Sequence, residues 1–521
     1  MKRLLSILLA VILAITVTAC GNANQASKSS KNKTGGSLTI AVAGDPLVLN
    51  PNYASDRVTL TIQQALYAPL FYINGRKVTP ALGNKLTASK DQRQYTLILK
   101  KNLTWHDGKP LTAKDVVFTL NTILDKKQNS DLRGNFIFDN KPVKAVAKDN
   151  TTVVFTLPQV APAFRLSLEQ LFPIPEHVFH GVTNIQKSAK NNHPIGSGPY
   201  QFVAYKSGQY VELKKFDHFF GGKPHLNKVI FRVAKDQNAA NLGLQNNSIQ
   251  LKAIQPEDVQ KVKSKGNIDV IAYPEYRLNY ATFNENVPIF KNKTFRQAIS
   301  YALNRKDIIK SAYGSEEYAQ PASSIFTADV KFQNKSVQNY PYSLTKAKQL
   351  LKKSKVDTKQ PLTIYYLNNN AAQESIALYF QQQFKKIGLN LQLKPTDIAA
   401  IGNIELDRKS KAYGILLNGY IMGPEADVYK VLYQTTSPYN YANYHNAALD
   451  KIWNEAAVET SESKRADDYN KIQKQIADDA VLYPISYDDA LLAISKNYGG
   501  IKEAKPQPVT IFRDLSKLYQ K

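Results

Sequence analysis

The hydrophobic and polar positions of the chain change period near its middle, in the stretch 276–310. From Tyr276 to Phe283 apolar and aromatic residues alternate with more polar ones, which is typical of a half-buried strand. From Phe295 onward the apolar residues follow the helical spacing i, i+3, i+4, i+7 and i+8. Thr294, followed three residues later by Gln297, predicts a capping box at the start of this helix.

The same two periods divide the rest of the chain into strands and helices. Asn304 predicts the start of a second helix, and Gly314 predicts its end. Residues 37–42 read as a strand followed by a turn-rich loop. In the second half, predicted helices alternate with predicted strands, at 344–351, 362–366, 375–387 and 389–393. This alternation indicates an α/β protein.

The stretch LTWHDGKPLTAKDVVF combines a tight turn with the start of a helix. Asp107-Gly108 predicts the turn, and Thr112 predicts a helix N-cap with Asp115 at the third position. His106 beside Asp107 resembles an acid–base pair in composition only. Neighbouring residues on a strand point to opposite faces, so we expect a structural role for both.

Composition sets the size and class of the molecule. At 521 residues the chain is too long for one core and predicts two or three domains. A hydrophobic share of 43% is ample for packed cores, so we expect a globular protein. The net charge of +26 predicts attraction to polyanions, whether nucleic acid, an anionic membrane or a cell wall.

The first residues of the chain narrow the choice among these polyanionic partners. Two basic residues, an apolar run and Cys20, the only cysteine of the chain, form the pattern of a secretory signal. The end of this segment, VTAC, resembles a bacterial lipobox in which Cys20 is lipidated. We therefore predict a signal peptide at 1–19 and a flexible lipidated tether at 20–36, rich in Asn, Ser and Lys. Outside the cytoplasm, nucleic acid is not an expected partner.

No pattern of catalytic residues competes with a binding function. Gly196-Ser197-Gly198 lacks the order of a nucleophile elbow or a phosphate loop. His177 and His180 are spaced closely enough to share a metal on a helix, but the H-E-x-x-H order is missing. With no thiol left after Cys20, cysteine catalysis and disulfides are excluded from the mature chain. We expect neither an enzyme, nor a cofactor, nor a metal site.

Three segments carry a family resemblance. Phe283-Asn284, FRQAISYALNR at 295–305 and the turn-and-helix stretch at 103–118 resemble the extracellular solute-binding proteins of peptide ABC importers, the oligopeptide- and dipeptide-binding family. Weaker likeness in order and type extends from Ser37 to about Val509. NYANY, from Asn440, resembles the Gram-positive lipoprotein branch.

The resemblance implies a two-lobed α/β fold of the periplasmic-binding-protein kind, in the large peptide-binding class, with an extra subdomain inserted in the first lobe. The implied boundaries are lobe I at 37–67, 191–283 and 486–521, the subdomain at 68–190, and lobe II at 284–485. Two hinge strands would join the lobes, one near Tyr280–Asn284 and one near Val481–Tyr487. Lobe I, the subdomain and lobe II denote the three sets of residues given above.

The function that follows from the resemblance is capture of extracellular oligopeptides in a cleft between the lobes. The implied partners are the peptide, an ABC permease with its ATPase subunits, and the cell membrane, on whose outer face the protein is held as a lipid-anchored monomer. A surface lipoprotein that acts as an adhesin or folding factor is the alternative of another class. Within the family, some members carry a solute other than peptide.

The resemblance also implies candidate contacts with the ligand. They come from the loop after the first strand, from a segment following Tyr413, and from the second hinge: Ser55, Asp56, Arg57, Asn418, Gly419, Tyr420, Ile421, Met422, Glu425 and Tyr487. For Ser55 to Arg57, a solvated loop is the competing interpretation.

One departure concerns the amino terminus of the peptide. In well-known family members an Asp shortly after a Gly-aromatic pair accepts the ligand's ammonium group, but here Met422 takes the nearest position after Gly419-Tyr420. Either Glu425 or Asp427 serves as the anchor, or peptides bind through their backbone without one. Because Glu425 aligns with a family acid, we predict Glu425 as the anchor. Both acids remain, on residue type alone, ordinary loop carboxylates.

Overall fold

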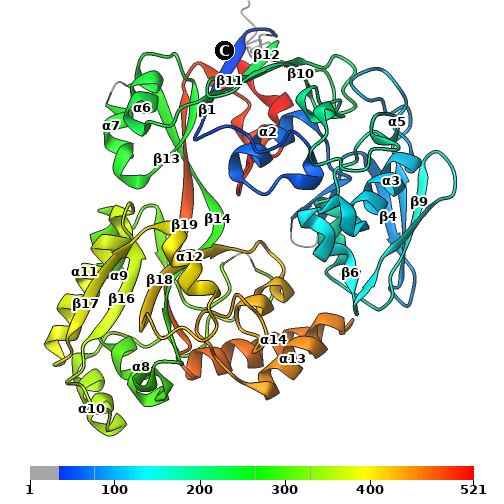
Figure 1. Ribbon diagram of the computed structural model, residues 1–521. Coiled ribbons are helices and arrows are strands. Elements are labelled where there is room, and N and C mark those ends of the chain that lie inside the picture. Colours follow the sequence, from blue (N-terminus) through cyan, green and yellow to red (C-terminus); the bar gives the residue numbers. More distant parts are fainter. Residues whose placement is uncertain (1–33, 75–76, 265, 329) are drawn as a thin grey trace, which may run out of the picture. The chain divides into compact units, whose positions relative to one another are not determined.

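A computed structural model describes residues 34–74, 77–264, 266–328 and 330–521 of the chain (Figure 1). The predicted signal peptide, Cys20 and most of the predicted tether lie outside these residues. Just before the first strand, the Gly35 N–H donates to the His225 carbonyl at 2.7 Å. In this part of the chain no helix has both the length and the apolarity of a membrane-spanning segment.

One mixed sheet of 11 strands runs through both lobes (Figure 1). Its order is β10-β11-β12-β1-β13-β19-β14-β18-β16-β17, and β15 pairs with β19. The strands are β1 (Ser37–Val42), β10 (Tyr200–Lys206), β11 (Tyr210–Lys215), β12 (Lys228–Val233), β13 (Leu251–Ile254), β14 (Ile268–Phe283), β15 (Ala319–Pro321), β16 (Leu362–Leu367), β17 (Leu391–Thr396), β18 (Ile415–Ile421) and β19 (Leu482–Ser495). Parallel pairing of β1 with β12 and of β16 with β17 and β18 confirms an α/β fold.

The two longest strands, β14 and β19, belong to both parts of the sheet. They pair antiparallel from Ile268 opposite Ser495 to Thr282 opposite Leu482. The register slips between Pro274 and Arg277, where Tyr276 has a left-handed φ of 55°, and again between Asn279 and Tyr280. The strand predicted from Tyr276 to Phe283 is therefore the second half of a longer strand, β14. The first half of β14, before Tyr276, also pairs with β19.

Helices cover the lobe I part of the sheet. They are α2 (Arg57–Leu66), α6 (Gln237–Gln245), α7 (Val259–Lys263) and α15 (Ile501–Ala504). The core beneath α2 gathers side chains from both ends of the chain, among them Leu38, Ile62, Phe231, Leu492 and Phe512, all almost fully buried. The carboxyl-terminal segment thus completes the first lobe.

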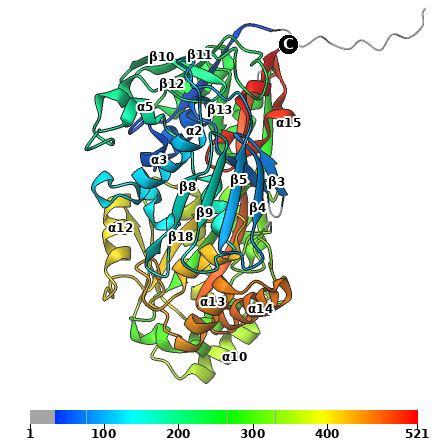
Figure 2. The same cartoon turned by 90° about the vertical axis from the view of Figure 1, so that its right-hand side faces the viewer.

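Residues 68–171 form a core of their own, built around Trp105, Leu120 and Phe155. A four-stranded sheet in the order β4-β5-β9-β8 lies over α3, and its strands stand side by side in Figure 2. The elements are β2 (Phe71–Asn74), β3 (Lys77–Pro80), β4 (Gly83–Ala88), β5 (Gln94–Leu99), α3 (Ala113–Leu124), β8 (Lys144–Ala147), β9 (Thr152–Thr156), α4 (Phe164–Glu169) and α5 (Glu176–Phe179). The predicted N-cap of α3 at Thr112 is confirmed, and the structure shows that Thr112 and Asp115 form a capping box there.

His106 joins this subdomain to lobe I. The Gly196 N–H donates to His106 Nδ1 at 3.1 Å, so the proton sits on Nε2, which contacts the Gly198 carbonyl at 3.0 Å. Burial lowers the pKa of His106 to about 4, so the ring stays neutral. A Cβ on Gly196 would lie 1.9 Å from the Leu66 carbonyl oxygen, so only glycine fits there. This motif is a packing contact between loops.

Lobe II alternates helices with its strands. The helices are α8 (Lys293–Tyr301), α9 (Arg305–Tyr313), α10 (Leu344–Ser354), α11 (Ala371–Lys386), α12 (Ile398–Leu406), α13 (Ala447–Val458) and α14 (Glu462–Asp478). The predicted cap of α9 by Asn304 and its end at Gly314, with a φ of 73°, are confirmed. The predicted capping box at Thr294 is wrong: the Asn292 side chain caps α8 by accepting from the Phe295 N–H, and the helix begins before Thr294.

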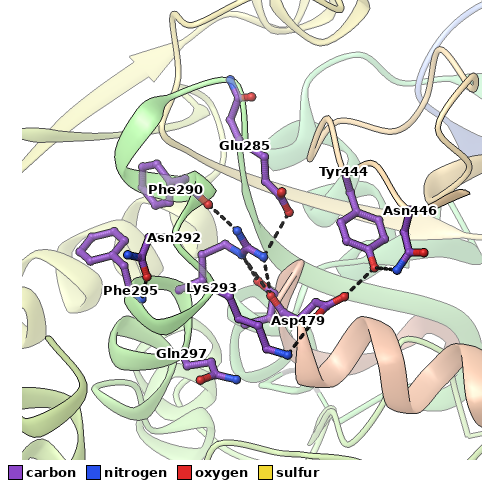
Figure 3. Close-up of polar contacts among 12 residues, drawn as sticks. Glu285, Phe290, Asn292, Lys293, Phe295, Gln297, Tyr444, Asn446 and Asp479 are labelled. Atoms are coloured by element: carbon purple, nitrogen blue, oxygen red, sulfur yellow. Dashed lines mark hydrogen bonds and ion pairs between the residues drawn. The ribbon is translucent and has the colours of Figure 1, made fainter. Parts of the chain in front are cut away.

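The arginine of the segment 295–305 has a structural role. Arg296 is buried and donates to the carbonyls of Asp479, Ala480 and Phe290. Its guanidinium also lies 3.3 Å from the Glu285 carboxylate, and Figure 3 shows Glu285 and Asp479 converging from different parts of lobe II. Arg296 therefore ties the exit of β14 to the entry of β19.

Candidate ligand cleft

β18 presents a backbone edge that no described strand covers. On one side it pairs with β14 along its length, from Ile415 to Ile421. On the other side β16 meets it only at Ile415 and Leu416. The segment 417–421 is therefore left with one side on which no described strand pairs. Within this segment the Gly419 N–H donates to the side-chain Oδ1 of the preceding residue, Asn418, at 2.7 Å. This edge can accept an extended chain as an added strand.

Gly419 lets two side chains of β14 lie close against its backbone. A Cβ at this position would come 2.6 Å from Asn279 Oδ1 and 2.8 Å from Arg277 Nη1. Both side chains project from β14 on the face that also carries Gly419. The glycine thus gives a guanidinium and an amide close access to the free edge.

A chain of charges runs from α2 to β14 beside this edge. Arg57, the first residue of α2, lies 2.7 Å from the buried carboxylate of Glu275. Arg277 Nε approaches the same carboxylate at 3.8 Å. Asp56 caps α2 by accepting from the Thr59 N–H, while Ser55 is exposed. Of the three predicted loop contacts, two already have partners within the protein.

A second polar cluster lies on β14 and β19, beside Arg277. Asp488 accepts from Tyr313 Oη at 2.7 Å and from Ser486 Oγ at 2.6 Å, and the Asn279 side chain also donates to it. Burial raises the pKa of Asp488, and the charge of Arg277 opposes this rise. These contacts hold the polar side chains of the two long strands in fixed directions.

The predicted tyrosines turn away from the edge. The Tyr420 ring is buried, and its hydroxyl donates to the Ile325 carbonyl. The Tyr487 hydroxyl accepts from the Ser324 N–H at 2.9 Å and lies 2.8 Å from the Phe326 carbonyl. Both hydroxyls are thereby occupied by the backbone of one loop. Ile421 and Met422 are partly exposed.

Asn418 directs its amide toward α12, where it donates to Glu405. Burial alone raises the pKa of Glu405 to about 7. The other acids of this region carry counter-ions: Glu425 lies 2.8 Å from Arg465, and Asp427 lies 3.1 Å from Lys430. The charge of the predicted ammonium anchor is thus balanced within lobe II, and its role toward a ligand stays a prediction.

A cavity of about 300 Å³ opens where the subdomain meets lobe II. The ion pair of Glu425 and Arg465 lies in the wall of this cavity. Lys331 and Glu462 also line it, and they lie 3.3 Å from each other. The subdomain contributes Arg165 among mostly apolar residues. Part of the cavity wall follows the free edge in sequence, because Pro424 and Glu425 come three and four residues after β18 ends.

Sequence reasoning missed several residues of this region. Glu275, Arg277 and Asn279 are the polar members of a strand whose alternate positions are apolar, so the period-two pattern itself carried a usable signal. Arg465 leaves no such signal, because its partner Glu425 lies 40 residues away, and nothing in the local sequence around Arg165 marks it as a wall residue of the cavity. His177 and His180, weighed as a metal pair, instead face Asp107 at 2.8 Å and Glu176 at 3.9 Å. Over the described ranges no three metal-ligating side chains converge.

Comparison with known proteins decides the family. Residues 77–443 match the bacterial extracellular solute-binding proteins, family 5, over the middle region of that family. The chain belongs to this family. The resemblance drawn from the sequence is confirmed, and so is the two-lobed α/β fold of family 5.

Family 5 relatives align along nearly the whole chain. The oligopeptide-binding protein AppA of Bacillus subtilis is 28% identical over 96% of this chain and 95% of its own. Among solved structures, the ABC transporter substrate-binding protein CtaP of Listeria monocytogenes is 61% identical, with a TM-score of 0.92 over 94% of this chain and 100% of that one. AppA of B. subtilis in complex with a nonapeptide gives a TM-score of 0.77 at 25% identity, over 94% and 100%.

Proposed function

We propose that this family 5 protein captures extracellular oligopeptides between its lobes and delivers them to an ABC permease, whose ATPase subunits drive import. The relatives named for oligopeptide binding support a peptide ligand, AppA with its bound nonapeptide in particular. The observation that carries the proposal is the free edge at 417–421, with Gly419 at its centre.

A strand edge recognises the backbone of its ligand rather than the side chains. Every peptide offers the same N–H and C=O groups, so pairing of this kind tolerates many sequences. Ser55, Asp56, Arg57, Asn418, Gly419, Tyr420, Ile421, Met422, Glu425 and Tyr487 remain the proposed ligand surroundings. In this proposal the backbone at 417–421 pairs with the ligand, and Arg57 borders one end of it.

Backbone methylation of the peptide tests this directly. Pairing along one edge uses alternate N–H groups, so N-methylation at every second position should weaken binding in one register and spare it in the other. Titration calorimetry with the two methylated series would measure the difference. If both series bind as tightly as the unmodified peptide, the strand edge is not the ligand site.

The proposal extends to location and domain boundaries. Cys20 would be the lipidated first residue of the mature protein and would hold a monomer on the outer face of the cell membrane. Lobe I, the subdomain and lobe II would divide at the boundaries given above, with no cofactor and no catalysis in the cleft.

A non-peptide solute is the second candidate within the family. NikZ of Campylobacter jejuni in complex with Ni(L-His) gives a TM-score of 0.78 at 23% identity over 93% of this chain and 99% of that one, a likeness of fold alone. Mass spectrometry of the small molecules that co-purify with residues 37–521 would separate these candidates. Absence of any bound or binding solute would favour the adhesin or folding-factor alternative.

A further inference from the structure

Among the described residues that line the cavity between the subdomain and lobe II, positive and negative charges do not balance. Its wall carries three cationic side chains, Arg165, Lys331 and Arg465, and two carboxylates, Glu425 and Glu462. Glu425 is 2.8 Å from Arg465, and Glu462 is 3.3 Å from Lys331. The two ion pairs leave one positive charge, that of Arg165.

Glu425 is held in place on the lobe II side by its ion pair with Arg465. The side chains of Glu425 and Arg465 are 15% and 7% exposed, and Arg465 also donates to the Ala456 carbonyl at 3.2 Å. A partly buried ion pair of this kind resists disruption, because separating it leaves a charge without solvent. Glu425 is therefore poorly placed to exchange Arg465 for a ligand ammonium group.

Arg165 faces the cavity from the opposite side. It is exposed, and it makes no ion pair with any residue that the structure describes. Its charge reaches the buried Tyr95 of the same wall, where it opposes the rise in the pKa of that tyrosine caused by burial. The rest of the subdomain side is largely apolar, with Ile73, Val78 and Leu166.

We propose that this cavity is a subsite for a carboxylate of the bound peptide, with Arg165 as its principal contact. A planar guanidinium can bind a carboxylate through two parallel hydrogen bonds, and the apolar wall suits the carbon atoms next to that group. A volume of about 300 Å³ accommodates the end or one side chain of a peptide rather than a whole ligand. The inference rests on the proposed function, because the wall residues Pro424 and Glu425 follow the free edge of β18 closely in sequence.

The carboxylate comes either from the peptide's carboxyl terminus or from an acidic side chain. A ladder of Ala/Ser peptides of three to nine residues distinguishes the two. Each length is prepared as free acid, as carboxyl-terminal amide, as amino-acetylated form, and with one Ser replaced by Glu or by Gln. Dissociation constants are measured by titration calorimetry for wild type, Arg165→Gln and the control Arg133→Gln, which removes the same charge from the same subdomain outside this cavity.

We expect wild type to bind one carboxylate form at least tenfold more tightly than its neutral counterpart. A preference for acid over amide assigns the carboxyl terminus, and a preference for Glu over Gln assigns a side chain. In either case Arg165→Gln should abolish the preference and Arg133→Gln should keep it. Because Arg165 is exposed, its replacement should leave the fold intact, which a melting curve checks.

Three results would overturn the inference. The first is peptide binding with no carboxylate preference, and the second is a preference that survives in Arg165→Gln. The third is a penalty for amino-acetylation that disappears in Glu425→Gln, which would give the cavity to the ammonium group instead. If no peptide of the ladder binds wild type at all, the proposed function itself fails, and the inference fails with it.

Discussion

Individual charged residues explain more of this molecule's stability than its net charge does. Most of the lysines are exposed, but a few ionisable groups are buried and have direct partners. Glu169 accepts from the Ile73 N–H at 2.8 Å, and burial raises its pKa to about 7 despite the charge of Arg513. Arg296 and Glu285 form another such group, and burial raises the pKa of Glu285 to about 7 as well.

Glu169→Gln should stabilise the protein at high pH only. A carboxylate whose pKa is raised on folding contributes its stability fully below the unfolded value, near 4.5, and loses it as the pH rises through about 7. Glutamine keeps the acceptor and cannot ionise, so the variant should gain up to about 1.4 kcal/mol relative to wild type per pH unit across this window. Urea unfolding at pH 4 to 8 measures the gain, and the exposed Glu316→Gln should show none. Equal pH profiles for Glu169→Gln and wild type would contradict the expectation.

Arg296→Met should be strongly destabilising. It removes the donor to three carbonyls and, at pH 9, where Glu285 is ionised, leaves this carboxylate without its counter-ion. Breaking a buried pair in this way costs about 3–5 kcal/mol. Adding Glu285→Gln should recover part of this loss, because no unpaired charge then remains. The exposed Lys306→Met is the control for charge removal. A loss below about 1 kcal/mol in Arg296→Met would show that its contacts contribute little.

At the scale of elements, the period of the hydrophobic positions predicted the strands and helices well, but it predicted their boundaries less well. The alternation at 276–283 and the caps at Thr112 and Asn304 are local patterns, and the structure confirms them. The start of α8 was not decided locally. Asn292 and Thr294 are both good N-caps, but Asn292 also donates to the Ser354 carbonyl at 3.0 Å, a contact 62 residues away that no local pattern reveals.

The correction at α8 can be measured. Asn292→Ala should lower the free energy of unfolding by about 1 kcal/mol, the usual cost of losing an N-cap, and more if the contact with Ser354 also counts. Thr294→Ala should change it by a few tenths, because Thr294 lies inside the first turn. Denaturant midpoints of the two variants decide, and a larger loss for Thr294→Ala would restore the capping box predicted from sequence.

In the candidate site, too, some residues could be predicted from the local sequence and others could not. The segment 418–425 was found through family resemblance, and the polar face of β14 was visible as alternation. The ion pair of Glu425 with Arg465 joins residues 40 apart, so its existence depends on how η7 (Ala426–Leu432) and α14 pack. Long-range pairs of this kind decide which charges are available to a ligand, and no spacing rule predicts them.

For the whole molecule, anchoring and ligand capture make separate predictions. Cys20→Ser should prevent acylation and release the protein from cells, because a signal segment cleaved without a lipid leaves no other apolar anchor in the predicted tether. Fractionation with an antibody against residues 37–521 measures the released share. A variant that stays with the membrane as fully as wild type would exclude lipidation as the anchor.

Ligand capture should appear as stability. A peptide that binds only the folded protein raises the free energy of unfolding by about 2.7 kcal/mol at a hundredfold excess over its dissociation constant. Melting curves with increasing peptide measure this rise, and X-ray scattering tests whether the particle becomes more compact. A binding peptide that leaves both unchanged would argue against capture between two lobes.

The uncovered side of β18 has a cost when no peptide is present. A bare strand edge with the sequence LNGYI, at 417–421, is a template for pairing with another copy of itself, the contact by which sheet proteins begin to aggregate. The net charge of +26 makes two copies repel each other before their edges meet. Self-association should therefore increase as salt screens this repulsion, and a bound peptide that covers the edge should suppress it.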